Sequence, residues 1–95
     1  MYTRRTKFPL KPNTNDQAAQ IAEKYKKVLH DLPGHVSTVM FLDEDSFMSI
    51  TTWDTQEHAE AVTSTRDAAQ SDLRDILAGA PSTSIASTVV HDVAS

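Results

Sequence analysis

Two of the four histidines in this chain occupy positions from which they could do acid–base chemistry. His35 follows Gly34 at the start of a predicted strand, and His58 lies near the start of a predicted helix. A histidine can act as a general base near neutral pH because its ordinary pKa is about 6.5. We therefore take His35 and His58 as candidate catalytic residues. The alternative is a loop residue at position 35 and a solvated first-turn residue at position 58.

Three arginines are candidates for contacting a ligand. Arg4 and Arg5 are adjacent in the first predicted strand, so their side chains point to opposite faces. One of them must face the buried side, where an unpaired charge is costly. It either contacts an anion or a carbonyl group, or forms a salt bridge across a dimer, or extends its stem to bring the charge to water. Arg66 lies on the apolar stripe of the second predicted helix and has the same alternatives.

The only tryptophan, Trp53, lies where a strand passes directly into a helix. Residues 47–53 are rich in aromatic and β-branched side chains and contain no Gly or Pro, which is typical of a strand. Asp54 is predicted as the N-cap of the following helix, with Glu57 as its capping partner. Trp53 either forms a pocket wall that stacks on a flat aromatic ligand, or seals the end of the sheet against a helix.

Composition and charge exclude several classes of function. The absence of cysteine excludes thiolate catalysis and cysteine-based metal sites, and it suits the reducing cytoplasm, where we expect this protein. No histidines and carboxylates have the spacing of a metal site, so we expect no metal. The net charge of −4 argues against nucleic acid and anionic membranes as partners. No long apolar run follows Arg4-Arg5 or occurs elsewhere, so we expect neither a signal sequence nor a membrane span.

The length of 95 residues predicts one domain, residues 1–95. Hydrophobic periodicity predicts strands at 2–10, 36–42, 47–53 and 83–93. It also predicts two helices, one from the N-cap Thr14 (with Gln17 as capping partner) to Leu32, and one from Asp54 to Ala80. The order βαββαβ predicts an α+β, ferredoxin-like fold, in which a four-stranded antiparallel sheet has both helices on one face.

The predicted hairpin of residues 36–53 is apolar on both faces. Pairing that is symmetric about its loop places Leu42 opposite Phe47, Phe41 opposite Met48, Val39 opposite Ile50, and Val36 opposite Trp53. One face then carries Val39, Phe41, Met48 and Ile50, and the other carries Val36, Met40, Leu42, Phe47 and Trp53. Two helices cover only one face, so whichever set stays bare is a large exposed apolar patch. We therefore predict a homodimer in which two sheets pack face to face.

The chain resembles the dimeric α+β barrel proteins of the antibiotic-biosynthesis-monooxygenase type. Three segments carry the resemblance: Leu10-Lys11-Pro12-Asn13 after the first strand, Leu32-Pro33-Gly34-His35 after the first helix, and the junction from Ser49 to Ala59 that contains Trp53-Asp54. The resemblance covers nearly the whole chain. It implies a homodimer with a pocket in each subunit between sheet and helices.

Family members include cofactor-free oxygenases of aromatic polyketides, quinol oxygenases and haem-degrading enzymes. The haem-degrading pattern is not matched, because Thr63 stands where a histidine is expected and residues 2–10 contain no asparagine. The resemblance therefore implies a monooxygenase that needs no metal or flavin and acts on a small aromatic or polyketide-like compound. The alternative is a non-catalytic dimeric barrel that binds a small apolar ligand.

In this interpretation the pocket is lined by the hairpin and its neighbours, and one basic group polarises the substrate. The predicted substrate-binding residues are Trp53, Arg4, Arg5, Phe41, Met48, Ile50 and Arg66. The polarising group is His35, His58 or one of the arginines.

Overall fold

The computed structural model describes residues 1–91 and shows the predicted order of elements, except that the second helix is divided in two. The elements are β1 (Tyr2–Pro9), α1 (Asn15–His30), β2 (His35–Leu42), β3 (Ser46–Trp53), α2 (Gln56–Ala61), α3 (Thr63–Asp72) and β4 (Ser82–Ser87). The last strand is shorter than the predicted 83–93, and residues 92–93 of that prediction lie outside the described residues. No helix within residues 1–91 has the length and apolar character that crossing a bilayer requires.

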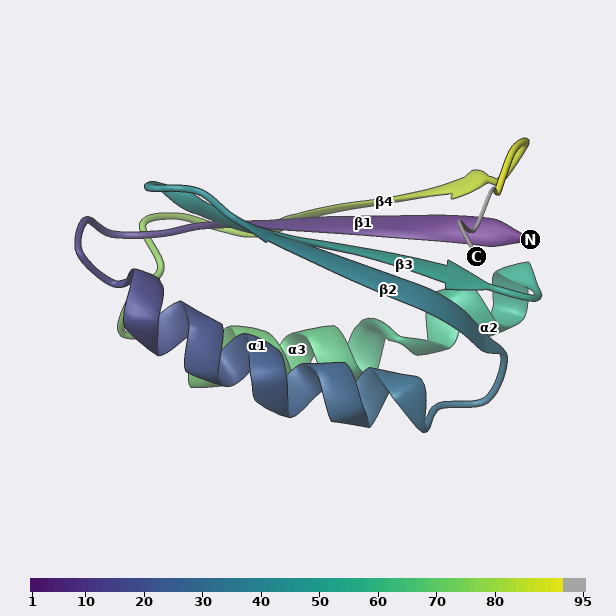
Figure 1. The fold of residues 1–95 in the computed structure, drawn as a ribbon, viewed down its shortest axis with the longest axis horizontal. Coiled ribbons are helices and arrows are strands. Elements are labelled where there is room, and N and C mark those ends of the chain that lie inside the picture. The colour runs from purple at the N-terminus through teal and green to yellow at the C-terminus, as the bar shows by residue number, and fades with distance from the viewer. Residues whose placement is uncertain (92–95) are drawn as a thin grey trace.

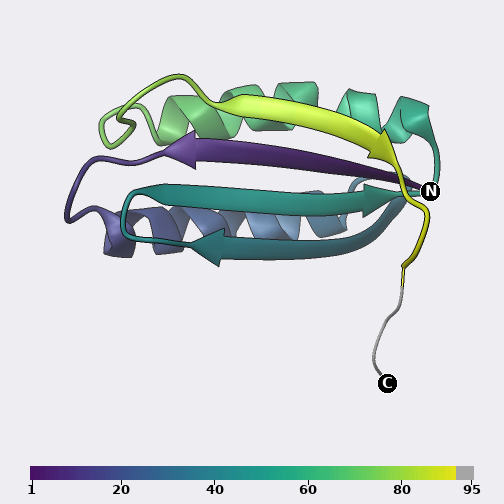
Figure 2. The same cartoon turned by 90° about the horizontal axis from the view of Figure 1, so that it is seen from above.

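The four strands form one antiparallel sheet in the order β2-β3-β1-β4. All helices lie on the same face of this sheet (Figure 1). Seen from the open face, α1 runs behind β2, whereas α2 and α3 run behind the edge formed by β4 (Figure 2). The predicted ferredoxin-like α+β fold is therefore confirmed.

The hairpin register is confirmed over most of its length. Leu42 pairs with Phe47, Phe41 with Met48, and Val39 with Ile50, as predicted. The predicted pair Val36–Trp53 is wrong, since Trp53 pairs with His35 instead. The register shifts between His35 and Ser37, because one extra residue on β2 forms a bulge there.

Both predicted capping boxes are wrong. Thr55, not Asp54, is the N-cap of α2, and its side chain accepts a hydrogen bond from the His58 backbone N–H at 3.2 Å. The Asp54 carboxylate binds the His58 ring instead. Thr14 is the N-cap of α1, but its hydroxyl donates to the Lys11 carbonyl at 2.7 Å and caps no helix N–H. Hydroxyl and carboxyl groups have several backbone partners within reach, and the local turn decides which one they bind.

The helix predicted to run from Asp54 to Ala80 is interrupted at Val62, which ends α2 and begins α3. A hydroxyl-rich run, Thr63-Ser64-Thr65, follows the break, and such side chains compete with helical backbone bonds. Thr63 does so directly, donating to the Glu60 carbonyl at 2.9 Å. α3 ends at Asp72, and the following turns bring Leu77 into a bridge with Leu10.

The core lies between the helices and one face of the sheet, in two clusters. The first contains Phe8, Leu10, Ala18, Phe47, Leu73 and Ile76. The second contains Leu29, Trp53, Ala59 and Val62. Phe8 and Phe47 are paired across β1 and β3, with ring centroids 5.7 Å apart. The helices therefore cover the hairpin face that carries Phe47 and Trp53.

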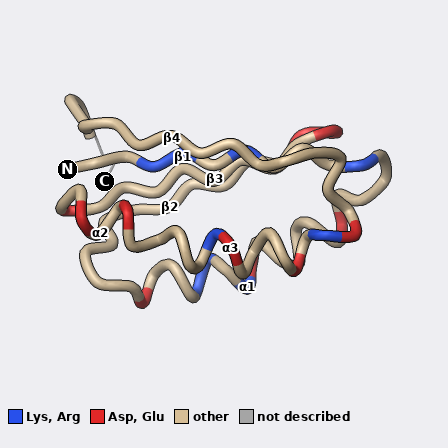
Figure 3. The backbone as a smooth tube through the Cα atoms, turned by 180° about the vertical axis from the view of Figure 1, so that it is seen from behind, with Lys and Arg blue, Asp and Glu red and all other residues tan. Residues whose placement is uncertain are grey.

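The bare hairpin face carries Val39, Phe41, Met48 and Ile50. Val39 and Phe41 are each 50% exposed. Within the sheet, Lys and Arg occur only on β1, at Arg4, Arg5 and Lys7 (Figure 3). Arg5 and Lys7 are exposed and alternate with buried Arg4 and Thr6, so they belong to the open face. That face thus combines an apolar half on β2 and β3 with a cationic strip on β1.

Candidate active site

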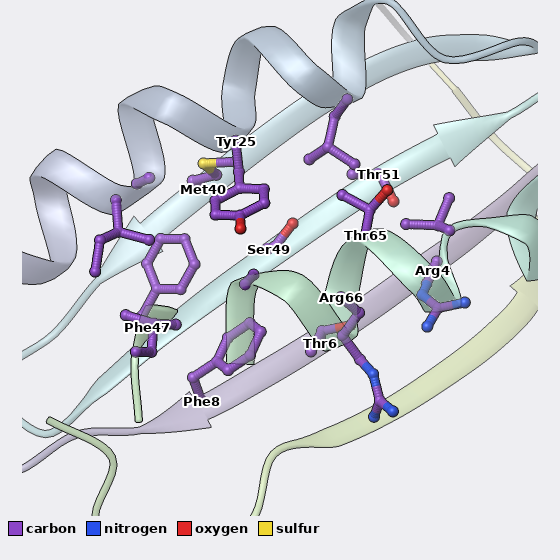
Figure 4. Close-up of a pocket in the computed structure, with 16 residues that line it drawn as sticks. Arg4, Thr6, Phe8, Tyr25, Met40, Phe47, Ser49, Thr51, Thr65 and Arg66 are labelled. Carbon is purple, nitrogen blue, oxygen red and sulfur yellow. The ribbon is translucent and has the colours of Figure 1, made fainter. Parts of the chain in front are cut away.

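A cavity lies between the sheet and the helices. Its volume is about 40 Å³. Apolar side chains supply most of its wall, and Arg4, Thr6, Ser49, Thr51, Thr65 and Arg66 contribute polar groups (Figure 4). The remaining lining residues are Phe8, Ile21, Ala22, Tyr25, Leu29, Met40, Phe47, Val62, Ala69 and Leu73.

Strand pairing explains why these polar residues meet. Arg4 pairs with Thr51 and Thr6 pairs with Ser49 across β1 and β3, and directly paired residues share a face of the sheet. This places three hydroxyl groups, those of Thr6, Ser49 and Thr51, on the floor of the cavity beside the arginine. Above them, α3 contributes Thr65 and Arg66. One end of the cavity is aromatic, with Phe8 and Phe47, while both guanidinium groups lie towards the other end (Figure 4).

Arg4 is the most deeply buried charged group among the described residues, with 4% of its surface exposed. One terminal nitrogen donates to the Ala59 carbonyl at 3.0 Å and to the Thr63 hydroxyl at 3.3 Å. Its Nε is buried and has no hydrogen-bond partner. Burial lowers the pKa of Arg4, and the positive charge of Arg66 lowers it further. An arginine keeps its charge despite such a shift, so the site remains cationic.

Arg66 lies at the border between the cavity and solvent, with 26% of its side chain exposed. Its outer nitrogen donates to Asp67 at 2.8 Å, and that carboxylate is mostly exposed. The Nε of Arg66 is buried and, like that of Arg4, has no partner. The two arginines therefore leave two buried donors without acceptors at the same site.

Tyr25 joins α1 to α3 above the cavity. Its hydroxyl donates to the Asp72 carboxylate at 2.7 Å, and Lys24 binds the same carboxylate oxygen at 2.8 Å. Burial and then the hydrogen bond to Asp72 raise the pKa of Tyr25 to about 12. The Tyr25 phenol is therefore neutral at physiological pH and acts as a hydrogen-bond donor between the two helices.

Trp53 does not line the cavity, but it contacts a residue that does. Its side chain is fully buried and belongs to the cluster with Leu29, Ala59 and Val62. Its Nε1 donates to the Thr51 hydroxyl at 2.8 Å. Thr51 does line the cavity, so the tryptophan holds the orientation of a cavity hydroxyl.

Neither candidate catalytic histidine lines the cavity. His35 is hydrogen-bonded through Nε2 to the Thr38 hydroxyl at 2.6 Å, and its ring meets that of Trp53 edge to face at 5.4 Å. Burial lowers the pKa of His35, and nearby His30 lowers it further. His58 Nδ1 lies 2.6 Å from the Asp54 carboxylate, near the surface, and this interaction is the main cause of the lowered pKa of Asp54.

The other predicted site residues divide between the two faces of the sheet. Arg4 and Arg66 line the cavity, whereas Arg5, Met48 and Ile50 do not. Arg5 is an exposed residue of β1 on the open face, and strand pairing places Ile50 beside Arg5, and Met48 between Lys7 and Phe41, on that same face. The sequence could not show which hairpin face the helices cover, because both are apolar.

A second hollow, of about 270 Å³, runs outside the cavity between α1 and the edge strand β2. Phe41 and Leu42 line it together with Ala19, Glu23, Lys26 and Thr38. Three residues, Ala22, Met40 and Phe47, line both this outer groove and the central cavity. Met40 is unbranched and flexible, so a change of its rotamer can connect the two spaces.

Sequence reasoning did not select Thr6, Tyr25, Thr65 or Met40 as site residues. For Thr6 and its strand neighbours, the sequence did contain a feature that indicates which face of the sheet the helices cover. Along residues 2–10 the large apolar side chains Phe8 and Leu10 lie on one face, whereas the other face carries Arg5 and Lys7. In this topology β1 pairs with β3, so the face of β1 identifies the covered face of the hairpin. No comparable signal marks Tyr25 or Thr65, whose positions depend on how the helices pack.

Comparisons of sequence identify no family model and no curated protein that matches this chain. Comparison of structures does find matches. A protein from Nitrosomonas europaea assigned to the antibiotic biosynthesis monooxygenases superposes with a TM-score of 0.82 at 15% identity, over 95% of this chain and 100% of the other. SnoaB from Streptomyces nogalater, described as a cofactor-independent oxygenase, gives a TM-score of 0.76 at 10% identity, over 95% and 94%.

This chain has the fold of the antibiotic-biosynthesis-monooxygenase structures. The resemblance drawn from the sequence is confirmed at that level. An anthrone oxidase-like protein is also similar, with a TM-score of 0.70 and 25% identity. The match covers 88% of this chain and 42% of that protein, so this chain corresponds to less than half of the longer one.

Proposed function

We propose that this chain is a monooxygenase that uses no cofactor and oxidises a small aromatic or polyketide-like compound. The observation that carries the proposal is the cavity, in which two arginines and several hydroxyl groups meet an otherwise apolar wall. Such a mixture orients a ligand through a few polar contacts while burying its apolar part. The fold supports the proposal, because it is shared with SnoaB, which is described as a cofactor-independent oxygenase.

Arg4 and Arg66 are proposed as the groups that polarise the substrate. They line the cavity, whereas His35 and His58 do not. A fixed positive charge in a site that excludes water stabilises negative charge that develops on a substrate oxygen. Thr6, Ser49 and Thr51 can orient a carbonyl or hydroxyl group, and Trp53 supports Thr51 from behind. The absence of cysteine is compatible with the cytoplasm as the place of action.

The size of the cavity sets a condition on this proposal. A cavity of about 150 Å³ holds benzene, and the cavity here measures about 40 Å³. An aromatic substrate therefore requires the space to open, and the outer groove beyond Met40 offers about 270 Å³ more. With Met40 displaced, the joined spaces of about 40 and 270 Å³ reach the lower limit of ligand pockets, roughly 300 Å³.

We further propose that the functional form is a homodimer. The open face of the sheet supports this, since Val39 and Phe41 are half exposed and stand beside Met48 and Ile50. A dimer that pairs two such faces removes both apolar patches from water.

Oxygen consumption tests the proposed activity. Oxidation of a ring CH2 to a carbonyl consumes one O2 and releases one water, so uptake should match product one to one. The assay uses anthrone- and quinol-type compounds, with Arg4→Gln as the test variant and Arg74→Gln, an exposed arginine, as the charge-matched control. We expect uptake by the wild type and the control, and at least about a tenfold lower kcat for Arg4→Gln.

One observation favours a non-catalytic binding protein as the second candidate. Among the described residues that line the cavity, none is His, Asp or Glu, so no side chain there has an ordinary pKa near neutrality. Saturable binding of these compounds without oxygen uptake would identify the chain as a carrier.

A further inference from the structure

We propose that the cavity binds an organic anion whose charge is carried by oxygen, as in a phenolate, an enolate or a carboxylate, with the charged end against Arg4 and Arg66. Calling this anion the substrate rests on the proposed oxygenase function. Its binding site is inferred independently, from the contacts of the two arginines.

Arg4 provides the first argument. A guanidinium group with 4% exposure has lost most of its hydration, and its contacts are limited to one carbonyl and one hydroxyl group. A buried charge is costly unless it is paired. Nε remains a buried donor with no acceptor, although Arg4 lies against a cavity. An oxygen anion in that cavity can supply both the missing charge and the missing acceptor.

Arg66 adds a second positive charge to the cavity, and this favours a negatively charged ligand. Burial is the main cause of the lowered pKa of Arg4, and the positive charge of Arg66 lowers it further, so the second guanidinium adds to the cost of burying Arg4. Among the described residues lining the cavity none is acidic, and Asp67 binds the outer, solvent side of Arg66. The site therefore has two cations and no anion facing the space between sheet and helices. A neutral ligand would leave this excess of positive charge without a counter-ion.

The rest of the cavity defines the other end of the ligand. Phe8, Phe47 and Met40 lie away from the guanidinium groups and present only apolar surface (Figure 4). Met40 and Phe47 also border the outer groove. A ligand with its oxygen anion at the arginines thus has its apolar part directed towards the groove between α1 and β2.

Calorimetric titration with matched probes tests this inference. Benzoate and 4-nitrophenolate carry the anion, and benzamide is the neutral counterpart of benzoate. We expect both anions to bind at least about tenfold more tightly than benzamide. Arg4→Gln and Arg66→Gln should each weaken anion binding by about ten- to a hundredfold and leave benzamide binding unchanged. Arg74→Gln removes the same charge from the surface and should change neither.

Two results would overturn the inference: equal binding of benzoate and benzamide, or anion binding that is absent or unaffected by both arginine variants. If Arg4→Gln does not fold, as its far-ultraviolet circular dichroism would show, Arg66→Gln decides, because that side chain reaches the surface. Preference for benzoate over 4-nitrophenolate would identify a carboxylate ligand. Anion binding without oxygen uptake would contradict the proposed activity alone, and oxygen uptake with neutral compounds without anion preference would contradict this inference alone.

Discussion

Gly34 has a backbone φ of 79°, in the region where a side chain causes strain. Its carbonyl accepts a hydrogen bond from the Asp54 N–H at 2.9 Å, so the loop after α1 is tied to the start of α2. The Asp54–His58 pair lies directly over the glycine, and an added Cβ would collide with both side chains. The Leu-Pro-Gly-His segment that supported the family resemblance thus has a structural reason for its glycine.

Replacing Gly34 with alanine should therefore destabilise the fold. The positive φ costs about 1–3 kcal/mol, and displacement of His58 adds to that cost. Gly79→Ala is the matched control, since its φ is ordinary for alanine and the nearest atom to a new Cβ is 3.9 Å away, on Pro9. Urea unfolding should show a loss of about 2–3 kcal/mol for Gly34→Ala and little change for Gly79→Ala. Equal stability of the two variants would disprove the steric argument.

The helices α1 and α3 meet above the cavity through Tyr25, Lys24 and Asp72. Opening this contact is one way to enlarge the cavity, because Tyr25 forms part of its wall.

The neutral Tyr25 phenol is the form that the fold stabilises, since its pKa is raised to about 12 from an ordinary value of 10. This contribution to stability is complete below about pH 10, where the unfolded chain also keeps its phenol neutral. It is lost as pH rises from about 10 to about 12.

The unfolding free energy should consequently fall more steeply in the wild type than in Tyr25→Phe over this pH range. The difference should be on the order of 2 kcal/mol, since one pKa unit corresponds to about 1.4 kcal/mol. Urea unfolding at several pH values and the tyrosinate absorbance give the two measurements. Asp72→Asn should move the pKa of Tyr25 back towards 10. A Tyr25 that titrates near 10 in the wild type would show that Asp72 does not hold its proton.

The elements themselves could be predicted from the sequence where periodicity is strong, as for α1, the hairpin and the one-sided strand β1. The failures have local causes. The break at Val62 depends on whether Thr63 donates to the Glu60 carbonyl, which a spacing of apolar residues does not reveal. The choice of Thr55 over Asp54 as N-cap follows from the Asp54–His58 pair. The placement of Phe41, Met48 and Ile50 on the open face followed from pairing with β1, a long-range contact.

In the whole molecule, the helix-covered face holds the cavity and the open face holds the apolar patch. Segment 88–91 crosses one end of that open face, where Thr88 bonds to Thr3 at 2.6 Å and His91 bonds to Ser37 at 3.2 Å. Val89 and Val90 in this segment are 93% and 80% exposed, so they add apolar surface beside the strands. Arg5 and Lys7 lie on β1, away from Val39 and Phe41 on the edge strand β2. Charged groups are depleted at the centre of stable interfaces, so we expect the apolar half to be central and β1 peripheral.

The homodimer predicts a solution mass of twice the 10.5 kDa of one chain. Phe41→Glu places one negative charge from each subunit at the centre of the expected interface. Burying these like charges is costly, so the variant should have the mass of a single chain. Val28→Glu is the control, because Val28 is an exposed apolar residue on α1, away from the sheet. It should leave the mass unchanged. Sedimentation equilibrium at micromolar concentration distinguishes the two masses. A wild-type mass near 10.5 kDa would refute the dimer, and an unchanged mass for Phe41→Glu would place the interface on another surface.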